Sequence, residues 1–179
     1  RLLDGDIAAA FFQEVLALPR AVRLLSDDHF TVDGTLLEAW ASHKSFRRRD
    51  TPPDPPQDSG NPSVDFRGET RTNDTHQSTT DPDARLFTKS RGSAATLCYM
   101  GHLLTENRHG LIVTALVTPA TGTAEREAAL AMLSELPDTG RITLGGDKNF
   151  DTRDFVRCAR ELGVTPHVAQ FPETTRRGS

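Results

Sequence analysis

A short β-prone run that leads into an aspartate beside a glycine occurs twice in this sequence. Residues 30–32 (Phe-Thr-Val) precede Asp33 and Gly34, and residues 141–146 (Arg-Ile-Thr-Leu-Gly-Gly) lead into Asp147. In open α/β sheets, functional groups gather beyond the carboxyl ends of parallel strands, so two such strands side by side would bring the two carboxylates together. Carboxylate oxygens are the ligands that Mg²⁺ and Mn²⁺ prefer. The repeated pattern therefore predicts a divalent-cation site at Asp33 and Asp147.

Each aspartate alone has a simpler interpretation. A single Asp at the end of a strand is more often a turn or helix-capping residue than a metal ligand. Two carboxylates in matching contexts make the ligand interpretation comparable to the structural one. Both interpretations stay open at the level of residue pattern.

The hydrophobic spacing predicts a mixed sheet with helices packed on it, because a hairpin is followed by alternating helices and strands. Right-handed crossovers can place the strand that leads to Asp147 beside the strand that leads to Asp33. Pro166 indicates that the last strand lies at an edge or ends there. The predicted elements are a helix over 7–18 that Asp4 or Asp6 caps and Pro19 ends, a strand at 30–33, a hairpin over 95–104 and 111–117, a helix over 121–136, a strand at 141–144, a helix over 152–162 and a strand over 164–169.

A polar insertion over residues 42–92 follows the first strand. It is poor in apolar residues, and its Pro-rich part, 51–56, cannot form a helix or a sheet interior. We expect much of it to lack structure and to be mobile without DNA, because it buries too little apolar surface to offset the entropy of ordering. Proteases should then cut it first, near a basic cluster that either contacts phosphates or is a solvated surface. This basic cluster consists of Lys44, Arg47, Arg48 and Arg49.

Composition limits the remaining possibilities. The 179 residues are enough for one sizeable core, and the formal net charge of −4 argues against a uniformly basic surface while allowing local basic patches. Cys98 and Cys158 lie in apolar runs, which indicates buried thiols in a reducing compartment. No run is long and apolar enough to cross a membrane, and the first residues do not resemble a signal peptide. The chain begins without a methionine, which fits a fragment.

Two other chemistries are disfavoured. His76, His102 and His109 could be combined with Cys98 into a zinc site, but they lack the short paired spacing of zinc ligands. Cys98 in an apolar strand should have a raised pKa, which does not favour a nucleophile.

Several motifs together resemble the DDE transposases of bacterial insertion sequences. Residues 32–36 (Val-Asp-Gly-Thr-Leu) are similar to the first acidic motif of that family, and residues 146–151 (Gly-Asp-Lys-Asn-Phe-Asp) are similar to the second. The resemblance covers residues 30–170. Between the two motifs, further short matches occur in the same order, at 73–76, 79–86, 100–102, 106–108 and 122–127.

The resemblance implies an RNase H-like catalytic domain, with the polar insertion after its first strand. It also implies two-metal phosphoryl transfer with Mg²⁺ or Mn²⁺, in which hydrolysis at the end of the element is followed by attack on target DNA. Asp33 and Asp147 match the first and second metal-binding residues, and Lys148 beside Asp147 either contacts DNA or balances charge. The implied partners are transposon ends and target DNA, with a homodimer in a synaptic complex, and the implied location is the nucleoid of the bacterial cytoplasm.

One departure from the family limits what we expect of this chain. The third acidic residue of the family is a Glu on a later helix with Tyr, Arg and Lys nearby, and Glu173 has no such context. We therefore expect a helical remnant of another domain at 1–28, a partial catalytic domain at 29–170 without the C-terminal part of the fold, and a tail at 171–179. Such a chain should bind Mn²⁺ weakly and should not cut DNA alone. The alternatives are a non-catalytic DNA-binding or partner-binding remnant of the same fold, and a metal-dependent nuclease.

Overall fold

The computed structural model describes residues 7–50, 71–88, 92–137 and 140–170. The chain divides into two compact units, and strands β1 (His29–Glu38), β5 (Thr96–Glu106) and β6 (Ile112–Pro119) each contribute residues to both. The first unit takes its described residues from Arg1–Thr35, Gly101–Val117 and Thr123–Ser179. The second unit takes them from Leu36–Met100 and Thr118–Gly122.

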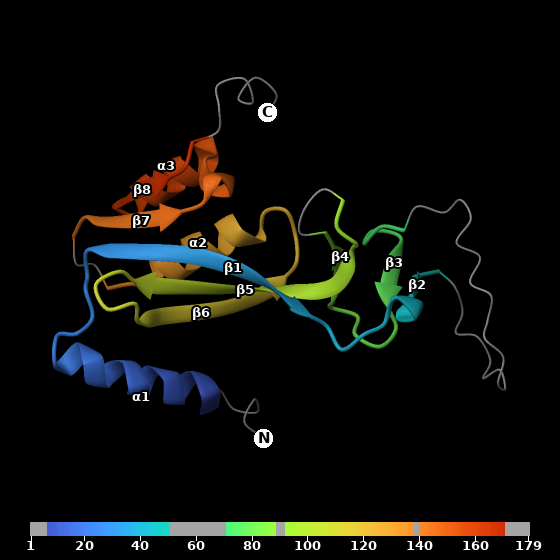
Figure 1. Ribbon diagram of the computed structural model, residues 1–179, viewed down its shortest axis with the longest axis horizontal. Helices are drawn as coiled ribbons and strands as arrows, with labels where there is room; N and C mark the ends of the chain where they lie inside the picture. The colour runs from blue at the N-terminus through green and yellow to red at the C-terminus, as the bar shows by residue number, and fades with distance from the viewer. Residues whose placement is uncertain (1–6, 51–70, 89–91, 138–139, 171–179) are drawn as a thin grey trace. The chain divides into compact units, whose positions relative to one another are not determined.

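The first unit contains a mixed sheet with the strand order β6-β5-β1-β7-β8 (Figure 1). β5 and β6 (Ile112–Pro119) form the predicted hairpin, in which the Glu106 N–H donates to the Leu111 carbonyl at 2.9 Å. β7 (Ile142–Gly146) is parallel to both β1 and β8 (Val164–Val168), and β8 is at the edge as predicted. This mixed sheet flanked by helices is compatible with an RNase H-like fold.

The apolar residues after Asp33 allow the first strand either to extend or to turn into a helix, and the structure shows that it extends. β1 does not end at Asp33 but continues through Gly34 to Glu38, so Asp33 lies inside the strand. The β-branched and apolar residues that follow Gly34 favour extended backbone, and a single Gly does not end a strand that has a paired neighbour. That pairing persists beyond β1, where the Ala39 N–H donates to the Leu97 carbonyl at 2.9 Å.

The core of the first unit lies between this sheet and helices α2 (Ala124–Ser134) and α3 (Arg153–Glu161). The strands contribute alternate residues such as Phe30 and Val32 of β1, as the period of two predicts. The N-terminus of α3 is capped, because the Thr152 hydroxyl accepts the Phe155 N–H at 3.3 Å. The buried core residues are Phe30, Val32, Leu104, Val113, Ala129, Met132, Leu133, Ile142, Leu144, Phe150, Phe155, Ala159 and Val164.

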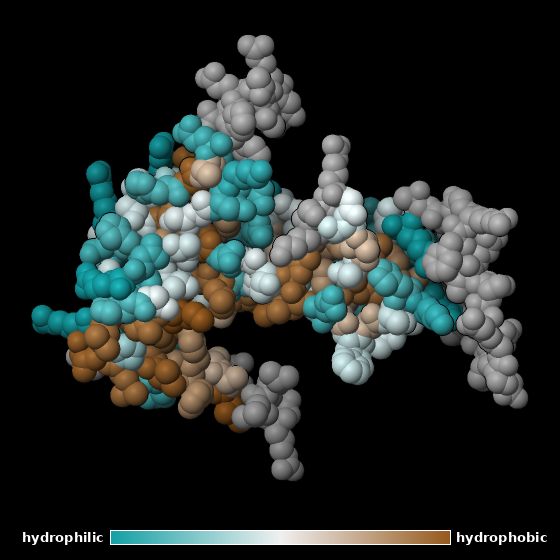
Figure 2. Space-filling model, in the orientation of Figure 1, coloured by the Kyte–Doolittle hydropathy of each residue, from teal (hydrophilic) through white to brown (hydrophobic). Residues whose placement is uncertain are grey.

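Helix α1 (Ile7–Ala21) differs from its prediction in two ways. It includes Pro19 rather than ending there; a proline this close to the end interrupts the ladder only in the last turn. The predicted apolar face is exposed, with Phe11 70% and Leu18 71% accessible, whereas Leu16 is buried. Figure 2 shows this apolar surface over α1. The predicted capping residues, Asp4 and Asp6, lie outside the described residues.

The described parts of the polar insertion belong to the second unit, and the prediction that they lack structure is wrong. A 3₁₀ turn η1 (His43–Ser45) leads into β2 (Phe46–Arg48), which pairs antiparallel with β3 (His76–Ser78). β4 (Arg85–Phe87) pairs antiparallel with the beginning of β5. Residues 51–70 and 89–91, including the Pro-rich part, lie outside the described residues. Mobility and preferred protease cleavage in the insertion stay predictions.

Few apolar residues are enough to order these segments, because polar contacts support them. Phe46 is buried with Ala84 and Leu97 and stacks on the His76 ring at 5.4 Å. The Asn73 side chain donates to the Leu86 carbonyl at 3.0 Å and accepts the Leu86 N–H at 2.8 Å, as a neighbouring strand would. Such local side-chain pairing is hard to recognise from composition.

The two cysteines are free thiols. Cys98 is buried as predicted, whereas Cys158 is only partly buried. Burial raises the pKa of the Cys98 thiol, in the direction expected from its apolar strand. None of the described helices is both long and apolar enough for a membrane span.

Candidate metal centre

The register between β1 and β7 brings the two predicted aspartates into line. His29, Phe30 and Thr31 pair with Thr143, Leu144 and Gly145, so each partner is 114 positions further along the chain. The same offset, continued for two residues, puts Asp33 opposite Asp147. The predicted adjacency of two parallel strands is thus confirmed, and the binding of a cation by the two carboxylates stays a prediction.

Asp33 is on the exposed side of β1. Phe30 and Val32 are buried while Thr31 and Asp33 are exposed, as alternation along a strand requires. The Asp33 carboxylate oxygen Oδ1 accepts the N–H of Gly34 at 2.9 Å. Its remaining lone pairs are available to an approaching ligand, because a carboxylate has about four acceptor positions.

Asp147 follows β7 directly and caps the 3₁₀ turn η2 (Lys148–Phe150). Its Oδ1 accepts the backbone N–H of Asn149 at 2.7 Å, and its Oδ2 accepts the Asn149 side-chain amide at 3.3 Å. Asp147 therefore has the capping role that the sequence pattern allows for a single aspartate. Capping also fixes the carboxylate, since both oxygens are held by one neighbour.

Glu125, the second residue of α2, is a third carboxylate that the sequence analysis missed. Its oxygen Oε1 lies 2.7 Å from the position that a Cβ atom would take at Gly34. Burial raises the pKa of Glu125, the charges of Asp147 and Asp33 raise it further, and a hydrogen bond with Asn149 lowers it. The available signal was the glycine after Asp33, which leaves room for a side chain from another element.

The three carboxylates interact electrostatically but do not surround one point. Successive residues of a strand direct their side chains to opposite faces, so the Asp33 carboxylate and the Glu125 carboxylate lie on different sides of β1. Accordingly, the described residues contain no group of three or more His, Cys, Asp or Glu side chains arranged to hold a metal ion. The site that the register defines is the pair Asp33 and Asp147.

The residues predicted to contact DNA belong to both units. Lys148 is exposed beside Asp147 in the first unit. The basic cluster is exposed in the second unit, where Lys44 lies in η1 and Arg49 donates to the Asn73 carbonyl at 3.0 Å. Arg47 and Arg48 are successive residues of β2, so their side chains leave the strand on opposite faces.

Comparison with known proteins gives only weak similarities. No protein-family model matches the chain, and no curated protein matches it. One similar solved structure is an intasome of simian T-cell lymphotropic virus in complex with PP2A regulatory subunit B56 gamma, at 10% identity and a TM-score of 0.41. Another is a piggyBac transposase synaptic complex with hairpin DNA, at 13% identity and a TM-score of 0.42.

The matched region is most of this chain but a minor part of each similar structure. It covers 82% of this chain and 33% of the intasome chain, and 84% of this chain and 26% of the piggyBac chain. Likenesses this weak do not establish a family. The function proposed below therefore rests on the residues of this chain.

Proposed function

We propose that the first unit is the cation- and DNA-binding core of a DNA phosphoryl-transfer protein of the transposase type. The observation that carries this proposal is the register of β1 and β7, which, continued two residues beyond the Thr31–Gly145 pair, would put Asp33 opposite Asp147. The acidic motifs at 32–36 and 146–151 that resemble DDE transposases contain the same two residues. Strand cleavage and strand transfer by the whole protein are part of the proposal.

The donor groups suit Mg²⁺ or Mn²⁺. Asp33 and Asp147 would hold the ion through carboxylate oxygens, the ligand type that these hard cations prefer. The charges of both residues raise the pKa of Glu125, which indicates mutual repulsion that a divalent cation would relieve. When bound, such an ion stabilises the developing charge on the attacking and leaving oxygens of a phosphodiester.

The neighbouring side chains have positioning roles in this proposal. Asn149 holds both oxygens of Asp147 and so limits the directions in which that carboxylate can accept a ligand. Lys148 places a positive charge next to the pair, where it would attract a phosphate. The basic cluster of the second unit would contribute further, non-specific attraction to the DNA backbone.

One observation favours a second candidate function. Because the three carboxylates do not converge within the described residues, the chain is also suited to bind DNA and a cation without cleaving the strand. This candidate corresponds to the non-catalytic remnant considered from sequence, and cleavage assays separate it from the first.

Cation-dependent DNA binding tests the proposal. We expect a fluorescently labelled duplex to bind the parent chain more tightly with Mn²⁺ than without it, because an ion at the aspartate pair attracts a phosphate. Asp33→Asn should remove the Mn²⁺ effect, and Asp154→Asn, at an exposed residue of α3, should retain it. A parent that binds equally with and without Mn²⁺, or an effect that survives in Asp33→Asn, would overturn the proposal.

A further inference from the structure

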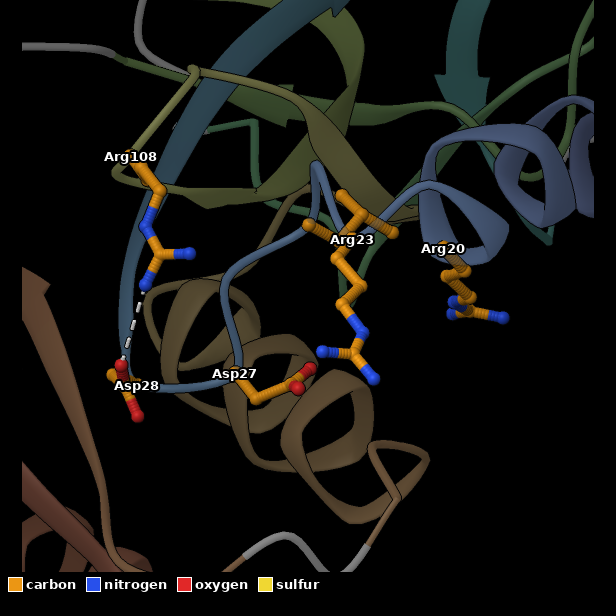
Figure 3. A pocket seen from close by; sticks show the side chains of 6 residues that line it. Arg20, Arg23, Asp27, Asp28 and Arg108 are labelled. Atoms are coloured by element: carbon orange, nitrogen blue, oxygen red, sulfur yellow. Dashed lines mark ion pairs between the residues drawn. The ribbon is translucent and has the colours of Figure 1, made fainter.

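A cavity of about 370 Å³ lies in the first unit, near the start of β1 and away from the aspartate pair. Arg20 comes from the last turn of α1, Arg23 and Leu25 from the segment after it, and Arg108 from the turn between β5 and β6. The remaining lining residues are Asp27 and Asp28. Figure 3 shows Arg23 extending toward Asp27 and Arg108 reaching Asp28. Two stretches far apart in the sequence, the end of α1 and the turn between β5 and β6, therefore bring guanidinium groups to one cavity.

The cavity has an excess of positive charge in a chain whose net charge is −4. Arg108 and Asp28 form an ion pair at 3.6 Å, and both side chains are more than half exposed. An ion pair this long and this exposed contributes little to the free energy of folding, so an anion can compete with Asp28 for Arg108. Within the described part of the chain, the structure shows no ion pair or side-chain hydrogen bond for Arg20 or Arg23. The Arg20 guanidinium is thus available to a ligand, and the Arg23 guanidinium, which extends toward Asp27 without forming an ion pair among the described residues, can also turn to one (Figure 3).

The backbone at Arg23 provides an independent observation. Arg23 has a φ of 57°, and it is the only described residue other than glycine with a positive φ. The Leu24 N–H donates to the Pro19 carbonyl at 2.8 Å and the Arg23 N–H donates to the Arg20 carbonyl at 3.1 Å, which is the Schellman ending of a helix. Glycine is the usual residue at this position, and another residue costs about 1 kcal/mol there. The backbone at Arg23 therefore carries strain that a glycine would relieve.

A structural role alone explains Arg20 but not Arg23. A basic residue in the last turn of a helix is favoured by the helix dipole, and Arg20 is in that place. Arg23 lies just beyond α1 in a left-handed backbone conformation, where a glycine would be more stable than an arginine. Interaction with the helix dipole therefore does not explain Arg23. Hence helix stability explains the presence of Arg20 but not that of Arg23.

We propose that Arg20, Arg23 and Arg108 form a phosphate-binding site for the DNA backbone, apart from the aspartate pair. The planar guanidinium donates two parallel N–H groups, and that geometry matches the oxygens of a phosphodiester. The identity of the ligand as DNA rests on the proposed function, whereas the anion site itself follows from the cavity. Phosphate contacts of this kind position a duplex without reading its sequence.

The spacing along β1 relates this site to the aspartate pair. Asp28, which lines the cavity, is five positions before Asp33. Five residues of strand span about 17 Å at roughly 3.3 Å per residue. The cavity would thus hold a phosphate separated by a distance of that order from one at Asp33 and Asp147.

The salt dependence of DNA binding tests this site. Anisotropy of a labelled duplex is measured without divalent cations between about 50 and 200 mM salt for the parent, Arg20→Ala and Arg23→Gly. Each variant should reduce the slope of log affinity against log salt by about one, because each removes one phosphate contact. Arg23→Gly should also raise the unfolding temperature, since glycine relieves the left-handed backbone. A gain in stability together with a loss of DNA affinity cannot come from misfolding.

The control is Arg160→Ala, which removes one charge from an exposed position on α3. It should keep the parent slope. The phosphate site would be overturned if the slope fell as much in Arg160→Ala as in the cavity variants. It would also be overturned if Arg20→Ala and Arg23→Gly kept the parent slope, or if the parent did not bind DNA. Because no Mn²⁺ is present, this result is independent of the cation test. The phosphate site can fail while the Mn²⁺ effect at Asp33 persists, and the Mn²⁺ effect can fail while the phosphate site persists.

Discussion

The carboxylate of Glu125 occupies the space where the side chain of residue 34 would be, with Oε1 2.7 Å from the Cβ position at Gly34. Gly34 follows Asp33 in β1, so Glu125 approaches the proposed site from the opposite side of that strand. The relationship explains why the pKa of Glu125 responds to Asp147 and Asp33 without the three groups forming one ligand set.

We predict that the purified chain does not nick supercoiled plasmid DNA in Mn²⁺. Two aspartates can hold one ion, but two-metal catalysis needs a further ligand to fix the second ion, and positioning supplies much of the rate. Gel electrophoresis of the plasmid checks this. Nicking by the parent that disappears in Asp33→Asn and Asp147→Asn would contradict it, and further loss in Glu125→Gln would identify Glu125 as the missing ligand. Glu173, considered from sequence, lies outside the described residues.

Two glycines near the site should differ in their tolerance of alanine. A Cβ at Gly146 would be 2.9 Å from Cδ2 of Phe150, whose ring is buried in the core and cannot move freely. Gly146→Ala should therefore lower the free energy of unfolding by about 1–3 kcal/mol. Gly34→Ala should cost less, because the carboxylate of Glu125 is the mobile end of a side chain and can shift. Denaturant titration of both variants tests the difference; equal losses would show that Glu125 is held as firmly as Phe150.

Glu106 should contribute more to stability than any exposed carboxylate. Its side chain is fully buried and accepts the backbone N–H groups of Arg108, His109 and Leu111, at 2.9, 2.7 and 3.2 Å, and of Ser26 at 3.3 Å. Glu106→Gln should lower the free energy of unfolding by about 1–3 kcal/mol, because an amide cannot accept from all of these donors. Glu161→Gln, at an exposed residue of α3, is the control and should change stability little.

The contribution of Glu106 should also depend on pH. Burial alone would raise the pKa of Glu106, but the backbone hydrogen bonds lower it below the ordinary value of 4.5. A depressed folded-state pKa means that the stabilisation is present above about 4.5 and is lost as the pH falls through the folded-state value. Unfolding at a series of acidic pH values should show this decline in the parent and a weaker one in Glu106→Gln. Parallel curves for the two proteins would refute it.

Tyr99 offers a direct test of the second unit. Its hydroxyl donates to Oδ1 of Asp81 at 2.6 Å, and this bond, assisted by burial, raises the pKa of Tyr99 to about 12. Tyr99 is the only tyrosine in the chain, so the rise in ultraviolet absorbance that accompanies tyrosinate formation reports it alone. Asp81→Asn should lower the pKa toward the ordinary 10.0, and Asp83→Asn, which acts only through charge, should lower it less. A parent that titrates near 10 would contradict the hydrogen bond.

Sequence patterns were sufficient for the elements whose hydrophobic period is clear. The hairpin, α2, α3 and the strands around Ile142 and Val164 were all predicted, because their apolar residues alternate or recur at helical spacing. The pairing of β1 with β7 followed from the handedness of crossovers. This pairing is what aligns Asp33 with Asp147.

The rest depended on contacts that no local pattern reveals. The approach of Glu125 to Gly34 requires a crossover of the chain, so the position of Glu125 near the start of a helix does not reveal it. The order in the insertion comes from pairs such as Asn73 with Leu86, which composition does not reveal. Composition alone therefore predicted a structureless insertion. The exposed face of α1 has helical spacing, which predicts a helix but not what covers it.

Direct measurement of Mn²⁺ binding tests the central claim, that Asp33 and Asp147 share one cation. Calorimetric titration is compared for the parent, Asp33→Asn, Asp147→Asn and the double variant. If one ion bridges the pair, each single variant should lose most of the affinity and the double variant should lose little more, because the two effects are not additive. Single variants that bind Mn²⁺ as tightly as the parent, or losses that simply add in the double variant, would contradict a shared site.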